Sequence, residues 1–294
     1  MDSRARAALR ASAFFLQGPP GMQAHSLSPA AQAGISQGLL EAVRRDAPLV
    51  QCLTNFVSMN YAANALLAIG ASPAMVHAAE EAPEFARMSG AVVINIGTLS
   101  ASWLESMLLT AESAGRAGTP WVLDPVAHHA TAFRRDAVQR LLDLRPAIIR
   151  GNASEIIALA GGRSAGKGVD SGNAVAQAEQ SASAIAAARG AVVAVTGEVD
   201  FVTDGSRSVR IAGGSALMPR VTATGCALTA TVGAFAAVSR ADPYAAAVAA
   251  LSCFAIAGRR SGAQSEGPGS FAWRFLDALA ALDADSLARE SPLH

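Results

Sequence analysis

The sequence predicts an α/β protein in which a mostly parallel β-sheet is covered by helices on both faces. From residue 31 onward, short runs rich in β-branched residues alternate with longer stretches rich in Ala and Leu. This repeat is typical of parallel strands joined by helical crossovers. Because no internal repeat and no linker rich in Pro, Gly or Ser divides the chain, we expect residues 31–294 to form a single domain.

The first 30 residues predict a disordered tail. They hold Arg4, Arg6 and Arg10 and only a brief apolar patch, which is too short for the core of a signal peptide. A start site assigned upstream of Met22 is an equally simple interpretation, and a transit peptide is a weaker one.

The strands and helices can be placed from the pattern of apolar residues. The β-branched runs predict strands at residues 49–53, 74–77, 91–95, 121–123, 147–149 and 191–196. The Ala- and Leu-rich stretches predict helices that include residues 57–69, 102–117, 136–142 and 174–189. Residues 201–203 and 209–211, joined through Asp204-Gly205-Ser206, predict a β-hairpin.

Two uncharged segments, residues 221–239 and 243–258, raise the question of a membrane. Both are rich in Ala, Thr, Ser and Gly rather than Leu, Ile and Phe, and the second is shorter than a membrane span requires. The connection between them has Asp242 in a position to cap a helix and Pro243 at its first turn. We therefore predict two packed core helices and no membrane partner.

Charge and cysteine content bear on partners and compartment. The chain has 23 Lys and Arg against 23 Asp and Glu, a formal net charge of zero, and no sustained basic run. This balance argues against a nucleic-acid partner. The three cysteines, Cys52, Cys226 and Cys253, form no CxxC pair, which suits a reducing compartment, so a cytoplasmic location is predicted.

The strongest candidate for a functional site is the turn of small residues at 222–226, which runs into the first uncharged helix. Gly225 allows a ligand to approach the backbone, and the first helical turn offers N–H groups at the positive end of the helix dipole. Such a turn is suited to binding a phosphate. Cys226 lies in the same field, which would lower the pKa of its thiol. The alternative is an ordinary helix start with a buried structural cysteine.

Polar residues follow five of the predicted strands. In an open parallel sheet, ligands bind beyond the carboxyl ends of the strands, so we expect these residues to meet at one edge. They are Asn55, the segment from Asn95 to Thr98, Asp124, Arg150 with Asn152, and Thr196 with Glu198.

Two of these positions, together with Glu155 just beyond Asn152, suggest phosphate and metal chemistry. Arg150 is permanently charged and suited to clamp a phosphate. Asp124, followed by a proline at a strand end, is a candidate carboxylate for Mg²⁺, and Glu155 could reach a metal ion or a metal-bound water. The alternative for Glu155 is that its charge complements the dipole at the start of a helix.

Two other features are predicted to be structural. His128 and His129 lie near Asp124, but no second cluster supplies further ligands at a recognisable spacing, so we expect exposed loop histidines. Met75 lies in an apolar run, where a methionine usually fills the core.

These residues and the sequence around them resemble the hydroxyethylthiazole kinase family. Its members are the thiazole-salvage enzymes of thiamine biosynthesis and belong to the ribokinase-like kinases. The resemblance extends from about Pro48 to Phe271. It is carried by LTN at 53–55, NALLAIGASPAM ending at Met75, INIGTLS ending at Ser100, LDPVA around Asp124, IIRGNASEI around Arg150 and Glu155, KGVDS at 167–171, AVTGEVDFVTDG at 194–205, VTATGCALTA around Cys226 and GPGSF ending at Phe271.

The resemblance implies a ribokinase-like fold and transfer of the ATP γ-phosphate, with Mg²⁺, to the primary alcohol of 4-methyl-5-(2-hydroxyethyl)thiazole. It implies that Cys226 stands where related kinases have a catalytic Asp. It further implies a homotrimer with active sites between subunits. The implied site residues are Arg150 and Thr196 for ATP, Met75 and the backbone of Ala223 for the thiazole, and Asp124 and Glu155 for Mg²⁺ and the phosphates. From their places in the anion turn and at a strand end, Gly225 is also expected to contact ATP and Asn55 the thiazole.

The chain departs from the family pattern at three places. Ala223 stands where a glycine is expected in the phosphate turn, residues 127–130 are bulkier than expected, and Gln51 replaces a frequent His. None of these changes removes a catalytic group, so they concern the fit of the substrate.

Three other functions remain open from the sequence. A related kinase could act on another small alcohol such as hydroxymethylpyrimidine. A hydrolase or acyltransferase could use Cys226 as a nucleophile, although the sequence offers no convincing His partner. A non-catalytic module could bind the nucleotide without transferring phosphate.

Overall fold

The computed structural model describes residues 28–162 and 171–294. Of the tail predicted for residues 1–30, residues 1–27 lie outside this range, whereas Pro29 and Ala30 already belong to helix α2 (Pro29–Asp46). Ser28 caps this helix by accepting a hydrogen bond from the N–H of Ala31. Residues 167–170 of the KGVDS motif also lie outside the described residues.

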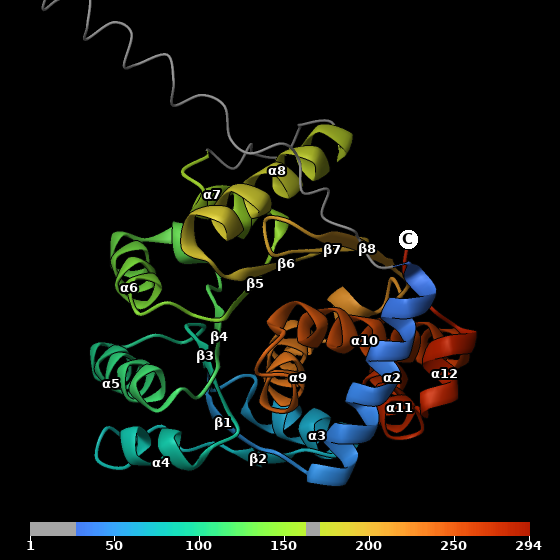
Figure 1. Ribbon diagram of the computed structural model, residues 1–294, viewed down its shortest axis with the longest axis horizontal. Coiled ribbons are helices and arrows are strands. Elements are labelled where there is room, and N and C mark those ends of the chain that lie inside the picture. Colours follow the sequence, from blue (N-terminus) through green and yellow to red (C-terminus); the bar gives the residue numbers. More distant parts are fainter. Residues whose placement is uncertain (1–27, 163–170) are drawn as a thin grey trace, which may run out of the picture.

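An eight-stranded sheet in the order β2-β1-β3-β4-β5-β6-β7-β8 runs through the centre of the molecule (Figure 1). The first six strands pair in parallel, and β7 and β8 add an antiparallel hairpin at one edge. The strands are β1 (Leu49–Leu53), β2 (Ser72–Ala74), β3 (Ala91–Asn95), β4 (Trp121–Asp124), β5 (Ile148–Asn152), β6 (Val192–Thr196), β7 (Val199–Thr203) and β8 (Ser208–Ala212).

Helices cover both faces of the sheet, as predicted (Figure 1). One face is covered by α2, α3 (Met59–Ile69), α9 (Thr224–Val238), α10 (Pro243–Gln264), α11 (Pro268–Ala280) and α12 (Ala284–Arg289). The other face is covered by α4 (Ala82–Met88), α5 (Ala101–Ala117), α6 (Ala132–Asp143), α7 (Ala153–Leu159) and α8 (Ser171–Arg189). Alternate residues of each strand contribute to the two cores, which is why the central strand β3 is buried along its whole length.

Several boundaries differ from the prediction because of contacts that are distant in sequence. The strand predicted at 74–77 lies at 72–74, since the carbonyl of Val76 accepts a hydrogen bond from the Gln51 side chain instead of extending the sheet. The strand predicted to end at Ile149 continues to Asn152, because its partner β6 pairs with it as far as Thr196.

The two uncharged segments form buried helices, α9 and α10, as predicted. Asp242 caps α10 by accepting from the N–H of Ala245, and Pro243 is its first residue. Helix α10 continues past the predicted end at Gly258, whose lack of a side chain allows the helix to pack against Gly214. Among the described residues, no helix is long and apolar enough to cross a membrane.

Helix α9 lies directly on the sheet (Figure 1). Its N-terminal turns contact Asn95 and Asp124, so this end of the helix reaches the carboxyl edge of β3 and β4. The helix approaches the sheet closely at Gly233, where an added Cβ would lie 2.5 Å from Cγ2 of Val93 and 3.2 Å from Cγ1 of Val50. Gly233 therefore sets the height of α9 above β1 and β3, and with it the position of the turn that precedes the helix.

Replacing Gly233 with Ala is expected to lower the free energy of unfolding by about 1–3 kcal/mol, the usual cost of overpacking a core. Gly38, in the exposed middle of α2, has no atom within 4 Å of an added Cβ. The matched Gly38→Ala variant should therefore be more stable by about 0.5–1 kcal/mol. Denaturant unfolding measures the free energy of unfolding of both variants. An unchanged value for Gly233→Ala would contradict the close packing of α9 against β1 and β3.

Candidate functional site

The turn before α9 has the backbone of an anion-binding turn. Ala223 is the N-cap residue, with φ 67° and ψ 0°, and it has no side-chain acceptor for the N–H groups of the first turn. The Gly225 position is open for a reason the sequence does not reveal. A Cβ there would lie 2.9 Å from Nη1 of Arg150, so the glycine lets the guanidinium group lie against the start of the helix.

The sulfur of Cys226 lies between two asparagine side chains. Nδ2 of Asn55 donates to Sγ at 3.4 Å and Nδ2 of Asn95 donates to it at 3.3 Å. The two amides are also joined to each other, because Asn55 Nδ2 donates to Asn95 Oδ1 at 2.8 Å. Cys226 is thus held by residues from the ends of β1 and β3.

Asp124, at the end of β4, is buried, and one of its carboxylate oxygens is the hub of the site. Oδ2 accepts hydrogen bonds from Asn95 Nδ2 at 2.8 Å and Thr229 Oγ1 at 2.7 Å, and it lies 3.7 Å from Arg150 Nη1. Oδ1 is buried and has no hydrogen-bond partner among the described residues. Burial raises the pKa of Asp124 to about 6, against the opposing charge of Arg150.

The thiol of Cys226 does not have the lowered pKa predicted from the helix dipole. Burial raises its pKa, and the nearby carboxylate of Asp124 raises it further, while the Asn55 and Asn95 amides and the Arg150 charge act in the opposite direction. The prediction was wrong because it rested on the helix dipole and did not include the burial of the thiol or the acid beside it.

Arg150 and Thr196 form a second part of the site at the ends of β5 and β6. Arg150 Nη2 donates to Thr196 Oγ1 at 2.6 Å. The guanidinium group therefore lies between this hydroxyl and Asp124, close to the first turn of α9. Through Arg150 and Asp124, polar residues from the ends of β1, β3, β4, β5 and β6 come together at one edge of the sheet, as predicted, whereas Glu198 is exposed.

Glu155 has both carboxylate oxygens occupied by backbone groups. Oε2 accepts from the N–H of Asn152 at 2.9 Å and completes a capping box at the start of α7. Oε1 accepts from the N–H of Ala127 at 2.9 Å. The residue therefore connects the start of α7 to the loop after β4, which agrees with the structural alternative given for it above.

The two histidines after Asp124 differ in their surroundings. His129 is exposed as expected, but His128 is buried, with 4% of its surface accessible, so the prediction of an exposed loop residue was wrong for it. The short 3₁₀ helix η1 (His128–Ala130) folds this ring inward, and burial lowers its pKa. Among the described residues, no group of three His, Cys, Asp or Glu side chains is arranged to hold a metal ion.

Met75 is half-buried and packs against the core after β2, as the pattern predicted. Asn95 is among the polar strand ends that the sequence predicts at this edge, but without a predicted role, and Thr229 is not singled out by the sequence. Thr229 lies one helical turn beyond Gly225, so a hydroxyl at that spacing in an apolar helix was the available signal.

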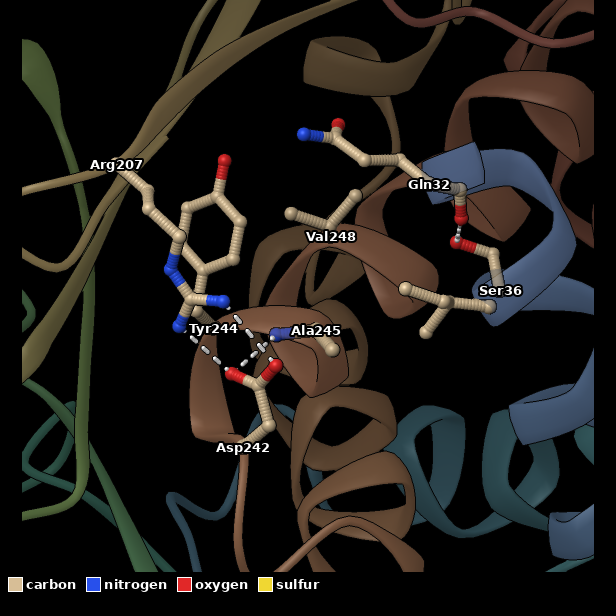
Figure 2. Close-up of a pocket in the computed structure, with 8 residues that line it drawn as sticks. Gln32, Ser36, Arg207, Asp242, Tyr244, Ala245 and Val248 are labelled. Atoms are coloured by element: carbon tan, nitrogen blue, oxygen red, sulfur yellow. Dashed lines mark hydrogen bonds and ion pairs between the residues drawn. The ribbon is translucent and has the colours of Figure 1, made fainter. Parts of the chain in front are cut away.

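A separate small hollow lies at the start of α10 (Figure 2). There Arg207 forms an ion pair with Asp242, and its Cζ atom lies 4.4 Å from the centre of the Tyr244 ring. The volume of this hollow, about 10 Å³, has room for about one water molecule. None of its lining residues belongs to the site around Asp124, and Arg207 there joins the β7–β8 hairpin to the cap of α10.

Comparison with known proteins decides the family. The model of the hydroxyethylthiazole kinase family matches residues 40–285. The chain belongs to this family. The hydroxyethylthiazole kinase of Rhizobium johnstonii is 67% identical over 249 residues, which cover 85% of this chain and 93% of the relative. That of Gemmatimonas aurantiaca is 58% identical over 248 residues, which cover 84% of this chain and 89% of the relative.

Solved structures agree with this membership of the hydroxyethylthiazole kinase family. The structure of the hydroxyethylthiazole kinase protein from Pyrococcus horikoshii OT3 aligns with a TM-score of 0.80 at 39% identity and covers 88% of this chain and 97% of that one. A ribokinase-like superfamily protein from Enterococcus faecalis V583 aligns with a TM-score of 0.60 at 12% identity, covering 93% and 100% of the two chains. The second likeness concerns the fold, which is ribokinase-like, as predicted.

The left-handed conformation of Ala223 leads to a stability prediction. A residue with a Cβ is disfavoured at φ 67°, so Ala223→Gly should raise the free energy of unfolding by about 0.5–1 kcal/mol. Ala184→Gly, in the exposed part of α8, should lower it by a similar amount. Thermal and denaturant unfolding of the two variants measure the change in the free energy of unfolding. An equal decrease of that free energy in both variants would show that residue 223 is not strained.

Proposed function

We propose that this protein transfers the γ-phosphate of ATP to the hydroxyl group of 4-methyl-5-(2-hydroxyethyl)thiazole. The observation that carries the proposal is the convergence of Arg150, Asp124 and Cys226 at the first turn of α9 in a chain of the hydroxyethylthiazole kinase family. In the reaction, the alcohol oxygen bonds to the γ-phosphorus, the bond from that phosphorus to the β,γ-bridging oxygen breaks, and the hydroxyl proton leaves.

Positioning and charge neutralisation supply most of the acceleration in phosphoryl transfer. The backbone at Ala223 and Gly225 would hold the transferring phosphate at the positive end of α9. Arg150, already oriented by Thr196, would neutralise charge on the phosphates of ATP. Asn55 and Met75 would contact the thiazole. These roles follow from the family resemblance and are supported by the location of the residues at the same edge of the sheet.

The residues present fit a magnesium ion at Asp124. Its Oδ1 is a buried carboxylate oxygen without a hydrogen-bond partner among the described residues, and carboxylate oxygen is the ligand Mg²⁺ prefers. When bound, the ion would supply positive charge to the β- and γ-phosphates. Each carboxylate oxygen of Glu155 accepts one backbone N–H and retains a second lone pair, so the residue could also accept from a metal-bound water while it orders the loop after β4.

The thiolate form of Cys226 would accept the hydroxyl proton as the general base. Burial and Asp124 raise the pKa of this thiol, so the thiolate is a minor form at neutral pH, and its contribution should be modest. A cysteine nucleophile would need a histidine base, and no described histidine is hydrogen-bonded to Cys226. The geometry therefore favours the kinase over a hydrolase or acyltransferase.

The first prediction from this proposal concerns substrate dependence. Purified protein with Mg²⁺-ATP should release ADP when hydroxyethylthiazole is added, much less with hydroxymethylpyrimidine, and none after chelation of the metal. Coupled ADP detection measures all three conditions. ATP binding without release in the presence of either alcohol would support the nucleotide-binding module instead.

Variants of Cys226 test the same reaction. Cys226→Asp should keep activity, because a carboxylate can also accept the proton, whereas Cys226→Ala should lower kcat about 10²-fold, near the lower end of a general-base contribution. Cys253→Ala, at a buried cysteine outside the site, is the control. Complete loss in Cys226→Asp with trapping of a covalent intermediate would favour the nucleophile mechanism.

We also propose a cytoplasmic homotrimer with active sites between subunits. The three cysteines are free, which suits a reducing compartment. Phe56 and Val57, directly after Asn55, are 70% and 60% exposed. An apolar surface of this kind beside the site is suited to contact another subunit.

The assembly can be tested by light scattering coupled to size-exclusion chromatography. The protein is expected to have three times the mass of one chain, and Val57→Asp should reduce that mass and lower activity because a charge disrupts an apolar interface. Leu109→Asp, at an exposed apolar residue of α5, serves as the control. A monomeric, fully active wild-type protein would contradict the proposal.

A further inference from the structure

Arg134 occupies an unusual position in the first turn of α6. A cation there faces the positive end of the helix dipole and is unfavourable. The guanidinium group is nevertheless half-buried and donates to three backbone carbonyls of two other loops. Nη1 donates to Ile96 and Val126 at 2.9 Å each, and Nη2 donates to Gly97. A residue that breaks a local rule in this way is a candidate for a functional role.

The carbonyls held by Nη1 belong to two peptide groups that also face the candidate site. The peptide group that joins Ile96 to Gly97 donates its N–H to Asn95 Oδ1 at 2.9 Å. The one that joins Val126 to Ala127 donates its N–H to Glu155 Oε1 at 2.9 Å. A peptide group is planar, so fixing its oxygen also fixes the direction of its N–H. One nitrogen of Arg134 therefore orients two donors to the site.

The first of these donors determines how the Asn95 side chain lies. Asn95 Oδ1 accepts from both Gly97 N–H and Asn55 Nδ2, so its Nδ2 must face the other way, toward Cys226 and Asp124. Gly97 also leaves room for this arrangement, since an added Cβ would lie 2.5 Å from Nδ2 of Asn55. A chain of hydrogen bonds therefore runs from Arg134 through one peptide group to Asn95, and from Asn95 to Cys226 and Asp124.

The second donor determines the position of Glu155. Its Oε1 accepts from Ala127, which has the left-handed φ of 49°, while Oε2 caps α7. Without Arg134, the Val126 carbonyl would lose the hydrogen bond that fixes the peptide group between Val126 and Ala127. The N–H of that peptide group is the donor to Glu155.

We propose that Arg134 is a positioning residue for phosphoryl transfer, which orders Asn95 and Glu155 by clamping the two peptide groups that donate to them. The inference rests on the proposed kinase function. Arginine is suited to this task because its rigid fork reaches several acceptors at once, whereas a lysine presents a compact charge on a flexible stem. Arg135, next in the chain, is exposed, and within residues 28–162 and 171–294 its side chain donates only to the carbonyl of His129, so it provides a matched control.

The test compares Arg134→Gln, Arg134→Lys and Arg135→Gln with the wild type in thiazole-dependent ADP release, at a temperature where unfolding curves show each variant to be folded. Arg134→Gln should lower kcat about 10²-fold, the scale of a misplacement of about 1 Å, with KM for ATP and thiazole changed less than about threefold. Arg134→Lys should recover part of that loss because it retains one charged donor. Arg135→Gln should match the wild type.

A double-mutant comparison separates positioning from a general structural effect. If Arg134 acts through Asn95, then Arg134→Gln should cost much less in an Asn95→Ala background than in the wild type, because coupled residues are not additive. Unchanged kcat in folded Arg134→Gln, or additive losses in the double variant, would overturn the inference while the wild-type activity stands. A wild type without thiazole-dependent ADP release would overturn the proposed function itself, and this inference with it.

Discussion

The site depends on a carboxylate that is buried at the end of β4. Removing a charged group from water is costly unless hydrogen bonds and an opposite charge replace the solvent. Asp124 receives these from three other elements, through Asn95 at the end of β3, Thr229 in α9 and Arg150 in β5. Satisfying this single group therefore brings together the parts of the chain that a phosphoryl-transfer site needs.

The same carboxylate explains the character of Cys226. A thiol at a helix N-terminus would usually be acidic, but burial and the neighbouring acid raise its pKa, and the two asparagine amides only oppose this in part. A weakly acidic thiol suits a reaction in which positioning and phosphate neutralisation dominate. It suits a covalent cysteine mechanism poorly, because that mechanism requires a ready thiolate.

Backbone groups contribute as much to the site as side chains. Two non-glycine residues with left-handed φ, Ala127 and Ala223, lie in the loops at the carboxyl edge. Such conformations persist only where the surroundings hold them. Here Glu155 and Arg134 hold the loop around Ala127, and the packing of α9 at Gly233 places the turn at Ala223.

The sequence by itself determined the α/β class, the bounds of β1 and β3, and the set of strand ends that carry polar residues, because these follow from local periodicity and from the geometry of parallel sheets. The family motifs added the kinase. Only the tertiary structure decided that Glu155 binds backbone groups, that His128 is buried, that Cys226 has a raised pKa and that Asn95 bridges Cys226 and Asp124. Burial and hydrogen-bond partners depend on residues distant in sequence, such as Ala127 for Glu155 and Asp124 for Cys226, and no local pattern encodes them.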